Sequence, residues 1–273
     1  MKYIFIDIDG TLLSHKLNKV PESALLALKK LKENGHRIFI CTGRALATCR
    51  DFYDLDVDGF VFNAGALVYA NKQRIYSNSF SSSESKVIID LIDKYGLGYM
   101  LEGEAGCYHN ELAKINNEEF VRSHFKELEL EQAYLEFRMY SLDYHDPRDP
   151  IYKICSYGSD RELFERFMLE IPSEYHCVLM TGEVDSDRIG LELTLKGVNK
   201  ATAAKRICEY YGATLNDAVA IGDSMNDYEI IRDCKIGIAM GNSTDKVKEV
   251  ADFVTDEASN DGLYKAFKSI GLI

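Results

Sequence analysis

The stretch KYIFIDIDGT, residues 2–11, decides the fold and points to the chemistry. A short run of apolar residues leads directly into two carboxylates, Asp7 and Asp9, and then into Gly10. Continuous apolar runs are typical of strands that are buried on both faces, and a glycine lets the backbone turn closely around a ligand. The stretch therefore predicts a buried strand over residues 2–8 that delivers two carboxylates to its carboxyl end.

Four further apolar runs also end in polar clusters that contain glycine. They cover residues 36–40, 59–62, 218–221 and 236–240. Helical patterns lie over residues 22–34 and 200–211, the second of them after Asn199, a suitable N-cap residue. Alternating strands and helices predict a parallel α/β sheet, and ligands bind beyond the carboxyl ends of such strands. We therefore expect the polar clusters to meet at one cleft.

The middle of the chain has a different pattern, with strands and helices in groups. We expect helices over 81–95, 111–125 and 161–169, and strands over 98–102, 107–109, 152–157, 177–181 and 190–194. The predicted fold class is α/β: a Rossmann-like, doubly wound parallel-sheet core with an inserted α+β cap domain. The core is expected over residues 1–80 plus 190–273, and the cap over residues 81–189.

Composition excludes several classes of partner. The 273 residues include 32 Lys and Arg and 44 Asp and Glu, a net charge of −12. Nucleic-acid affinity depends on neutralising phosphates with Lys and Arg, and an acidic field repels anionic membranes. We expect neither nucleic acid nor membrane as a partner. A small anionic substrate stays possible, because a metal ion and a few lysines can reverse the field inside one cleft.

The expected localisation is cytoplasmic. No apolar stretch approaches the roughly 20 residues of a membrane helix, and Asp7 and Asp9 interrupt the N-terminal apolar run too early for a signal peptide. The seven cysteines are an odd number without a C-x-x-C pair. Scattered reduced thiols therefore explain them better than a disulfide framework or a zinc site.

The two carboxylates of the first strand can carry out nucleophilic and acid–base chemistry. An aspartate held at a strand end can form an aspartyl-phosphate, and a second one nearby can act as general acid and base. Asp223 and Asp227 form a second acidic cluster, and Mg²⁺ prefers such oxygen ligands. Taken alone, each cluster also fits ordinary turns and helix caps; Asp7 and Asp223 together favour a metal site.

Two weaker signals lie at the other strand and helix ends. Thr42 and Gly43 can bind phosphate oxygens through a hydroxyl and a backbone N–H. Lys200 opens a helix, where the dipole does not favour a cation. It is therefore either an ordinary surface residue or a side chain directed at an anion near Asp7, and Lys196 is an alternative four residues earlier.

In this order, the four clusters resemble the motifs of the haloacid dehalogenase-like (HAD) phosphohydrolases, most closely the Cof-type branch with a large α/β (type IIB) cap. The family's D-x-D-G-T motif matches residues 7–11, and its G-D-x-x-N-D motif matches residues 222–227. The second motif matches Thr42 and the third matches Lys200. One departure is Asn63-Ala64-Gly65, where the branch commonly has Asn-Gly, so we assign this loop a structural role.

The resemblance implies a role for each motif residue. Asp7 is the nucleophile, and Asp9 protonates the leaving group and then activates water. The cofactor is Mg²⁺, bound by Asp7, Asp223 and the backbone carbonyl of Asp9, with Asp227 supporting the metal. The phosphoryl group is held by residues from all four motifs: Ile8, Thr42, Gly43, Lys200 and Asn226.

In this family the cap closes over the cleft and selects the substrate, which makes its polar residues candidate contacts. We single out Glu102, Arg122, Arg138 and Arg188. Further candidates are Tyr108, His109 and Asp185. A solvated surface role is the simpler explanation for each of them.

The predicted function is Mg²⁺-dependent hydrolysis of a small phosphorylated metabolite, a sugar phosphate or a phosphorylated cofactor, by a monomer or weak homodimer. A phosphomutase of the phosphomannomutase type and a non-catalytic metabolite-binding protein are the alternatives. The segment from Cys155 to Arg161 also fits the C-x5-R loop of cysteine-dependent phosphatases. Asp160 would place a carboxylate in that loop, so we treat the match as chance.

Overall fold

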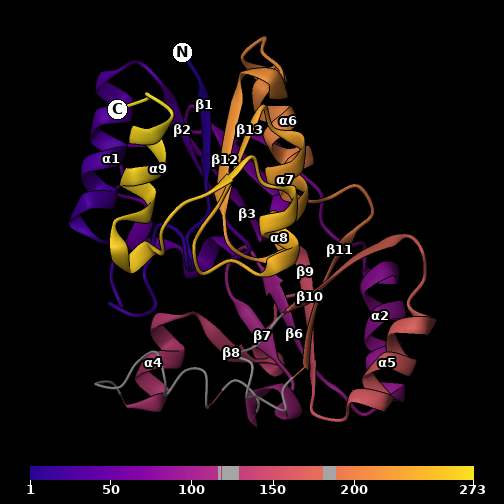
Figure 1. The fold of residues 1–273 in the computed structure, drawn as a ribbon. Coiled ribbons are helices and arrows are strands. Elements are labelled where there is room, and N and C mark those ends of the chain that lie inside the picture. Colours follow the sequence, from indigo (N-terminus) through magenta and orange to yellow (C-terminus); the bar gives the residue numbers. More distant parts are fainter. Residues whose placement is uncertain (116–117, 119–128, 181–188) are drawn as a thin grey trace. The chain divides into compact units, whose positions relative to one another are not determined.

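The computed structural model describes residues 1–115, 118, 129–180 and 189–273, which form two units (Figure 1). The first unit is the core, made of Met1–Gly43, Asp54–Ser77 and Val198–Ile273. The second unit is the cap, made of Arg44–Tyr53 and Asn78–Gly197. The cap was expected over residues 81–189, and two segments outside these limits also group with it. They are Arg44–Tyr53 and the strand Ile189–Leu195, which was expected to belong to the core.

The core contains an eight-stranded sheet in the order β14-β13-β12-β1-β2-β3-β4-β5. Its strands are β1 (Tyr3–Ile6), β2 (Arg37–Cys41), β3 (Gly59–Phe62), β4 (Leu67–Ala70), β5 (Gln73–Ser77), β12 (Ala218–Gly222), β13 (Ile236–Ala239) and β14 (Phe253–Val254). The strands from β14 to β3 are parallel. The expected parallel α/β core is thereby confirmed, with an antiparallel β4–β5 hairpin at its edge that the sequence pattern did not predict.

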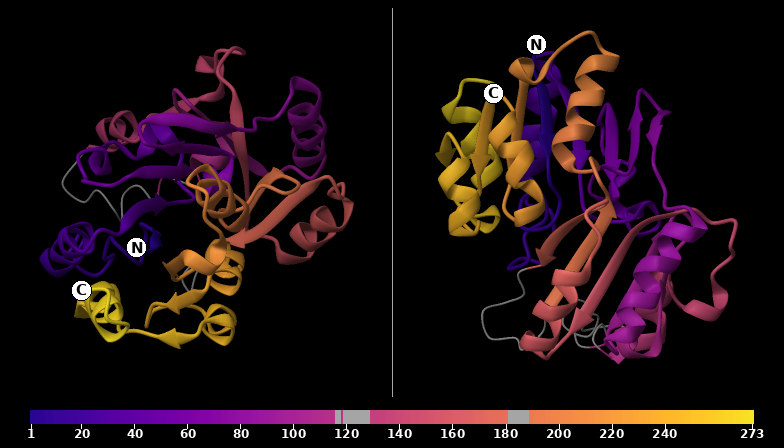
Figure 2. Two further views of the ribbon diagram at one scale, coloured as in Figure 1. Left: turned by 90° about the horizontal axis from the view of Figure 1, so that it is seen from above. Right: turned by 90° about the vertical axis from the view of Figure 1, so that its right-hand side faces the viewer.

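Helices cover both faces of this sheet. They are α1 (Glu22–Glu33), α6 (Lys200–Tyr210), α7 (Tyr228–Asp233), α8 (Asp245–Val250) and α9 (Gly262–Ser269). Figures 1 and 2 show α1 and α9 on one face and α6, α7 and α8 on the other. Both faces of each central strand are therefore buried, which explains why these strands are continuous apolar runs.

Alternating side chains of the central strands fill the two halves of the core. Phe5 and Phe39 pack with α6 residues such as Ile207, while Ile4 and Ile38 point to the opposite face, all fully or almost fully buried. Burying a side chain of this size contributes about 1.5–3 kcal/mol. The central strands are thus held firmly on both sides, and the loops at their carboxyl ends start from fixed points.

The cap contains a six-stranded, mostly antiparallel sheet in the order β10-β11-β9-β6-β7-β8. Its strands are β6 (Gly98–Gly103), β7 (Cys107–His109), β8 (Met139–Ser141), β9 (Ile151–Gly158), β10 (Tyr175–Met180) and β11 (Ile189–Leu195). Its helices are α2 (Ser82–Lys94), α4 (Leu130–Glu136) and α5 (Arg161–Glu170). The five strands expected here and the helices over 81–95 and 161–169 are present, and the α+β character of the insertion is confirmed. Helix α4 and strand β8 were not predicted.

Helices α2 and α5 pack on one face of the cap sheet through an apolar cluster around Ile88, Ile92, Phe164 and Phe167. Within the expected helix over 111–125, residues 111–115 and 118 are helical, and the others lie outside the described residues. Short 3₁₀ turns complete the two units. They are Leu46–Thr48, Arg50–Phe52, Asn63–Gly65, Leu142–Tyr144, Leu215–Asp217, Met225–Asp227 and Ala258–Asn260.

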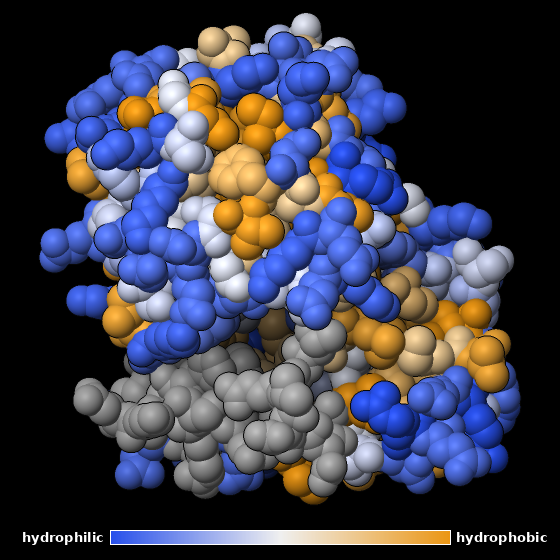
Figure 3. Space-filling model, in the orientation of Figure 1, coloured by the Kyte–Doolittle hydropathy of each residue, from blue (hydrophilic) through white to orange (hydrophobic). Residues whose placement is uncertain are grey.

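The surface agrees with the acidic, charged composition. On the face drawn in Figure 3, hydrophilic side chains cover most of the coloured surface, and apolar side chains gather in smaller areas between them. All seven cysteines are free thiols, and only Cys177 is exposed. Among the residues that the structure describes, no helix is long and apolar enough to span a membrane.

Candidate active site

The first strand places Asp7 at the carboxyl edge of the core sheet. The Asp7 N–H donates to the Ile221 carbonyl (3.1 Å), so the pairing of β1 with β12 continues one residue beyond the strand. The chain then turns sharply, because the Leu12 N–H donates to the Asp7 carbonyl (3.2 Å) and the Leu13 N–H to the Ile8 carbonyl (2.7 Å). Asp7 is therefore held by backbone bonds on both sides.

Lys200 joins the first and last motifs. Its Nζ donates to Asp7 Oδ1 at 2.7 Å and to Asp227 Oδ1 at 2.6 Å, and the side chain is only 1% exposed. Asn199 caps helix α6 as expected, by accepting from the Thr202 N–H. The two carboxylates compensate for the unfavourable helix dipole. Lys200 is therefore not a surface residue, and its ammonium group contacts Asp7 itself.

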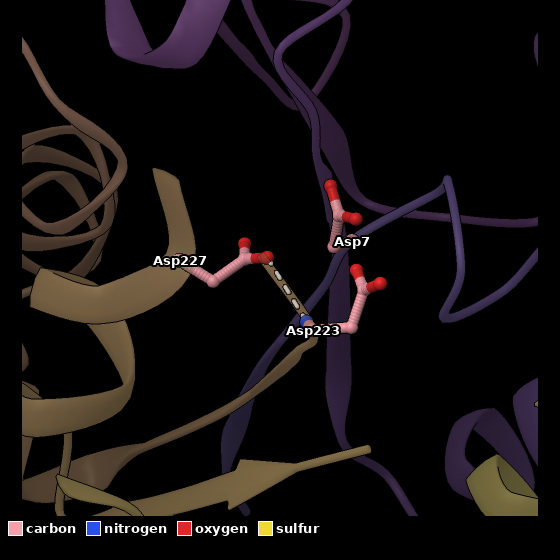
Figure 4. Close-up of side chains that lie close together, drawn as sticks. All are labelled: Asp7, Asp223 and Asp227. Atoms are coloured by element: carbon pink, nitrogen blue, oxygen red, sulfur yellow. Dashed lines mark hydrogen bonds between the residues drawn. The ribbon is translucent and has the colours of Figure 1, made fainter. Parts of the chain in front are cut away.

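Asp227 is anchored by the backbone of its own loop. Its Oδ2 accepts from the N–H of Asp223 at 3.1 Å, the bond drawn in Figure 4. It also accepts from the N–H of Ser224 at 3.1 Å. Gly222 has to be a glycine, because a Cβ there would lie 2.3 Å from Asp227 Cγ. With Lys200 on the other oxygen, Asp227 is fully engaged in holding the loop and the lysine in place.

The buried carboxylates have strongly perturbed acidities. Burial, followed by the charge of Asp227, raises the pKa of Asp7 well above its usual range, against the opposing effect of Lys200. Burial and Asp227 likewise raise the pKa of Asp223 to about 7. Burial disfavours the Lys200 ammonium, but Asp227 and Asp7 outweigh it and raise the pKa of Lys200. Three carboxylates share one ammonium group, so a further cation would stabilise the ionised forms of Asp7 and Asp223.

The arrangement of oxygens fits a hard metal ion. Carboxylate oxygens of Asp7, Asp223 and Asp227 all lie within 4.8 Å of one another. The carboxylates of Asp7 and Asp223 lie next to each other at the ends of two strands (Figure 4). Asp223 Oδ1 is buried and accepts no hydrogen bond from any residue that the structure describes. An orphaned carboxylate oxygen beside two others is the donor set that Mg²⁺ prefers.

The remaining core residues of the predicted site lie around the same strand ends. Thr42 directly follows β2 and is buried. Its N–H donates to the Val61 carbonyl (2.8 Å), and its carbonyl accepts from the Ala64 N–H (3.0 Å). Ile8 is fully buried, and its carbonyl accepts from the N–H groups of Thr11 (3.2 Å) and Leu13 (2.7 Å). Asn226 lies in the loop after β12, where its Oδ1 accepts from the Ser224 hydroxyl (3.0 Å). Gly43 directly follows Thr42 in the chain. The Asp9 carboxylate is not part of the group formed by Asp7, Asp223 and Asp227.

The Asn63 loop positions the helix that carries Lys200. Asn63 and Ala64 both have left-handed backbone angles, φ 48° and 53°. A Cβ on Gly65 would lie 2.3 Å from the Asn199 carbonyl oxygen, so only glycine permits this close approach to the start of α6. This geometry supports the structural role expected for the loop.

The cap candidates have different environments. Glu102 is buried in β6, where the Lys153 ammonium lies 3.2 Å from it and 2.6 Å from Glu192. Arg138 lies after α4 with a left-handed backbone, φ 51°. Arg122 and Arg188 lie outside the described residues, as does Asp185. Tyr108 donates to Asp149 Oδ2 (2.9 Å), and the His109 ring lies 5.7 Å from that of Tyr134.

The C-x5-R match is not a phosphate-binding loop. Cys155 lies in the middle of β9 rather than at its end, and its Sγ donates to Glu102 Oε1 at 3.3 Å. Burial raises the pKa of the Cys155 thiol well above its ordinary value. A cysteine nucleophile needs the opposite shift, so the structure excludes this reading.

Sequence reasoning missed two residues that shape the site. Gly222 was recognised only as part of a motif, although the space beside Asp227 requires it. Asn242 received no role, yet its side chain contacts both Gly10 and Asp223. Its position in a polar cluster after a buried strand, residues 236–240, was the available signal.

Comparisons with known proteins agree with this geometry. Residues 4–267 match the profile of the haloacid dehalogenase-like hydrolase family. A 5-amino-6-(5-phospho-D-ribitylamino)uracil phosphatase of Bacillus subtilis is 29% identical over 98% of this chain and 95% of its own. A phosphoglycolate phosphatase of Staphylothermus marinus is 24% identical over 97% of this chain and 95% of its own.

Solved structures show the same similarity. A HAD phosphatase from Bacteroides thetaiotaomicron has a TM-score of 0.80 and 27% identity, covering 100% of this chain and 96% of its own. A sugar phosphatase of HAD subclass IIB has a TM-score of 0.82 and 25% identity over 100% of both chains.

Proposed function

Since this chain belongs to the haloacid dehalogenase-like hydrolases, as a phosphatase of their Cof-type branch with a subclass IIB cap, we propose that it hydrolyses the phosphate ester of a small metabolite with Mg²⁺ and an aspartyl-phosphate on Asp7. The observation that carries this proposal is the Lys200 bridge between Asp7 and Asp227, beside the orphaned oxygen of Asp223.

In the first step, a carboxylate oxygen of Asp7 attacks phosphorus as the ester P–O bond breaks. Asp9 gives its proton to the departing alkoxide, so that a neutral alcohol leaves. Lys200 donates to Asp7 Oδ1, which favours the charged, nucleophilic form of Asp7 and fixes its direction. The product of this step is the aspartyl-phosphate.

In the second step, Asp9 accepts a proton from water as the water oxygen attacks the phosphorus of the aspartyl-phosphate. The bond between phosphorus and the Asp7 oxygen breaks, inorganic phosphate leaves, and Asp7 is regenerated. Thr42, Gly43, Lys200, Asn226 and the backbone of Ile8 hold the phosphoryl oxygens in both steps. Phosphoryl transfer depends mainly on such positioning and on charge stabilisation.

Asp7 and Asp223 would hold the Mg²⁺ ion together with the Asp9 backbone carbonyl, and Asp227 would support them. When bound, the ion supplies positive charge that offsets the negative charge of the carboxylates and of the phosphate. The raised pKa values of Asp7 and Asp223, caused by burial and by the charge of Asp227, support this assignment, because a bound cation would favour the charged carboxylates and lower both pKa values.

The substrate is proposed to be a small phosphorylated metabolite that the cap selects. Glu102 and Arg138 are proposed contacts, as are Arg122 and Arg188 on their sequence alone. The protein is proposed to act as a monomer or weak homodimer, which sedimentation velocity tests directly. The relatives' substrates define a first panel: the ribitylaminouracil phosphate, phosphoglycolate and sugar phosphates.

The test measures phosphate release from this panel with and without Mg²⁺, beside an Asp7→Asn variant. Release that needs Mg²⁺ and is lost in the variant supports the proposal. An isomer formed with little free phosphate would indicate a phosphomutase instead. Ligand-induced thermal stabilisation without any turnover would indicate a metabolite-binding protein.

A further inference from the structure

Asn242 connects two loops that come from opposite ends of the chain. It lies in the turn after β13, and its Nδ2 donates to the Gly10 carbonyl oxygen and to Asp223 Oδ2, both at 3.0 Å. Both partners are acceptor oxygens, so the amide must present its NH₂ group to them. One side chain thus joins the turn after Asp9 to the loop after β12.

We propose that Asn242 is a positioning residue that orients Asp223 toward the cation. This inference rests on the proposed Mg²⁺ site and assigns it a residue outside the four motifs. Asn242 occupies Asp223 Oδ2, while Oδ1 of the same carboxylate is buried without a partner among the described residues. With one oxygen fixed by the amide, the rotation of the carboxylate is set and the other oxygen is presented to the metal.

The contact with Gly10 makes the arrangement more restrictive. A Cβ on Gly10 would lie 2.2 Å from Asp223 Oδ2, so the backbone of this turn already lies against the same oxygen. Asn242 therefore fixes the position of Asp223 relative to Gly10. Gly10 directly follows Asp9, and the backbone carbonyl of Asp9 is a proposed metal ligand. An amide at position 242 adds no charge, whereas a carboxylate there would face Asp223 with the same charge.

The turn around Asn242 is itself well anchored. The Ser243 hydroxyl donates to the Gly222 carbonyl (3.2 Å), and the Thr244 N–H donates to the Asp223 carbonyl (3.3 Å). The Gly241 N–H donates to the Asp256 carbonyl (3.2 Å). The backbone of this turn thus stays in place when the amide is removed, which makes substitution of Asn242 informative.

The experiment compares Mg²⁺ binding by calorimetry in the substrate-free wild-type protein and in Asn242→Ala, Asn242→Gln, Asp223→Asn and Asn34→Ala variants. Asn34 is the matched control, an exposed asparagine of the core whose Nδ2 donates to the Leu272 carbonyl (2.7 Å). Removing a residue that orients a metal ligand typically weakens metal affinity roughly 10–100-fold.

We expect a loss of this size in Asn242→Ala, a smaller one in Asn242→Gln, which keeps the amide, and none in Asn34→Ala. Without Mg²⁺, Asn242→Ala and Asn34→Ala should melt at similar temperatures. A merely structural role for Asn242 would instead make Asn242→Ala melt at a lower temperature than Asn34→Ala. Wild-type affinity in Asn242→Ala overturns this inference alone, provided that Asp223→Asn loses binding. Equal binding, or none, in wild type and Asp223→Asn overturns the metal site and the inference with it.

Discussion

Lys200 Nζ lies 2.7 Å from Asp7 Oδ1, although 193 residues separate them in the chain. The same ammonium contacts Asp227 Oδ1 at 2.6 Å. A buried cation between two carboxylates explains how a strongly acidic group of side chains stays together at the end of a sheet. Through these two contacts, Lys200 connects the folding of the site with the charge state of Asp7.

Lys200→Met should destabilise the protein and abolish its activity. Removing one member of a buried ion pair typically costs about 3–5 kcal/mol, because the remaining charges lose their partner. Urea unfolding of the metal-free protein measures this loss. Lys205→Met is the control, because Lys205 lies on the same helix, α6, with its side chain 65% exposed. Equal free energies of unfolding for the two variants would contradict the ion cluster.

Gly10→Ala should remove Mg²⁺-dependent activity as well as lowering stability. The new methyl group would overlap Asp223 Oδ2, and the left-handed backbone, φ +79°, adds strain. Gly35→Ala separates these two effects, because Gly35 has φ +76° but nothing within 4 Å of the added Cβ. We expect both variants to lose stability and only Gly10→Ala to lose turnover. Similar turnover in both would show that the contact with Asp223 is unimportant.

The stability of the metal-free protein should depend on the acidity of Asp223. Its pKa is raised from 3.8 to about 7, so between these pH values the folded state binds more protons than the unfolded state. This contribution therefore falls as pH rises from about 4 to about 7, by at most about 1.4 kcal/mol per pH unit.

Asp223→Asn cannot titrate and provides the comparison for this pH dependence. We expect the variant to gain stability relative to the wild type as pH rises through this window. The measurement is urea unfolding at several pH values in the presence of a chelator. If the two proteins differed by a constant free energy of unfolding across this pH window, the pKa of Asp223 would not be raised in the folded state.

Cys155→Ser should keep its activity per folded molecule. Cys155 is buried in β9 and donates to Glu102, and a serine hydroxyl can replace this bond. The steady-state rate of phosphate release, normalised to folded protein by circular dichroism, measures the effect. Loss of activity in this variant together with retention in Asp7→Asn would reinstate the cysteine-phosphatase alternative.

Much of the core could be predicted from the sequence, because its strands are buried on both faces and their turns are rich in glycine. The strand over 59–62 was predicted with the bounds that β3 has, and Asn199 was recognised as the cap of α6. The β4–β5 hairpin was missed because its strand Gln73–Ser77 has an exposed, mostly polar pattern. Short edge strands of this kind depend on tertiary pairing more than on their own sequence.

The sequence predicted those site residues that directly follow strands. It did not predict the contacts that depend on turn geometry or on strand register. The sequence suggested that Asp7 and Asp223 would come together. It also placed Asn242 in a polar cluster after a buried strand, but the contacts of Asn242 depend on the geometry of a turn, which this position does not determine. It also gave no signal that Glu102, Lys153 and Glu192 would form a buried ion cluster in the cap. Those three residues meet through the register of antiparallel strands, which the sequence pattern alone does not determine.

The most direct test of the account is reductive trapping of the aspartyl-phosphate. Borohydride converts an acyl phosphate of aspartate to homoserine, which peptide mass spectrometry locates. The Asp9→Asn variant should be mixed with p-nitrophenyl phosphate and Mg²⁺, because it lacks the base that promotes the second step. The account predicts homoserine at position 7 that disappears when substrate or Mg²⁺ is omitted. Release of nitrophenol with no modification at position 7 would contradict it.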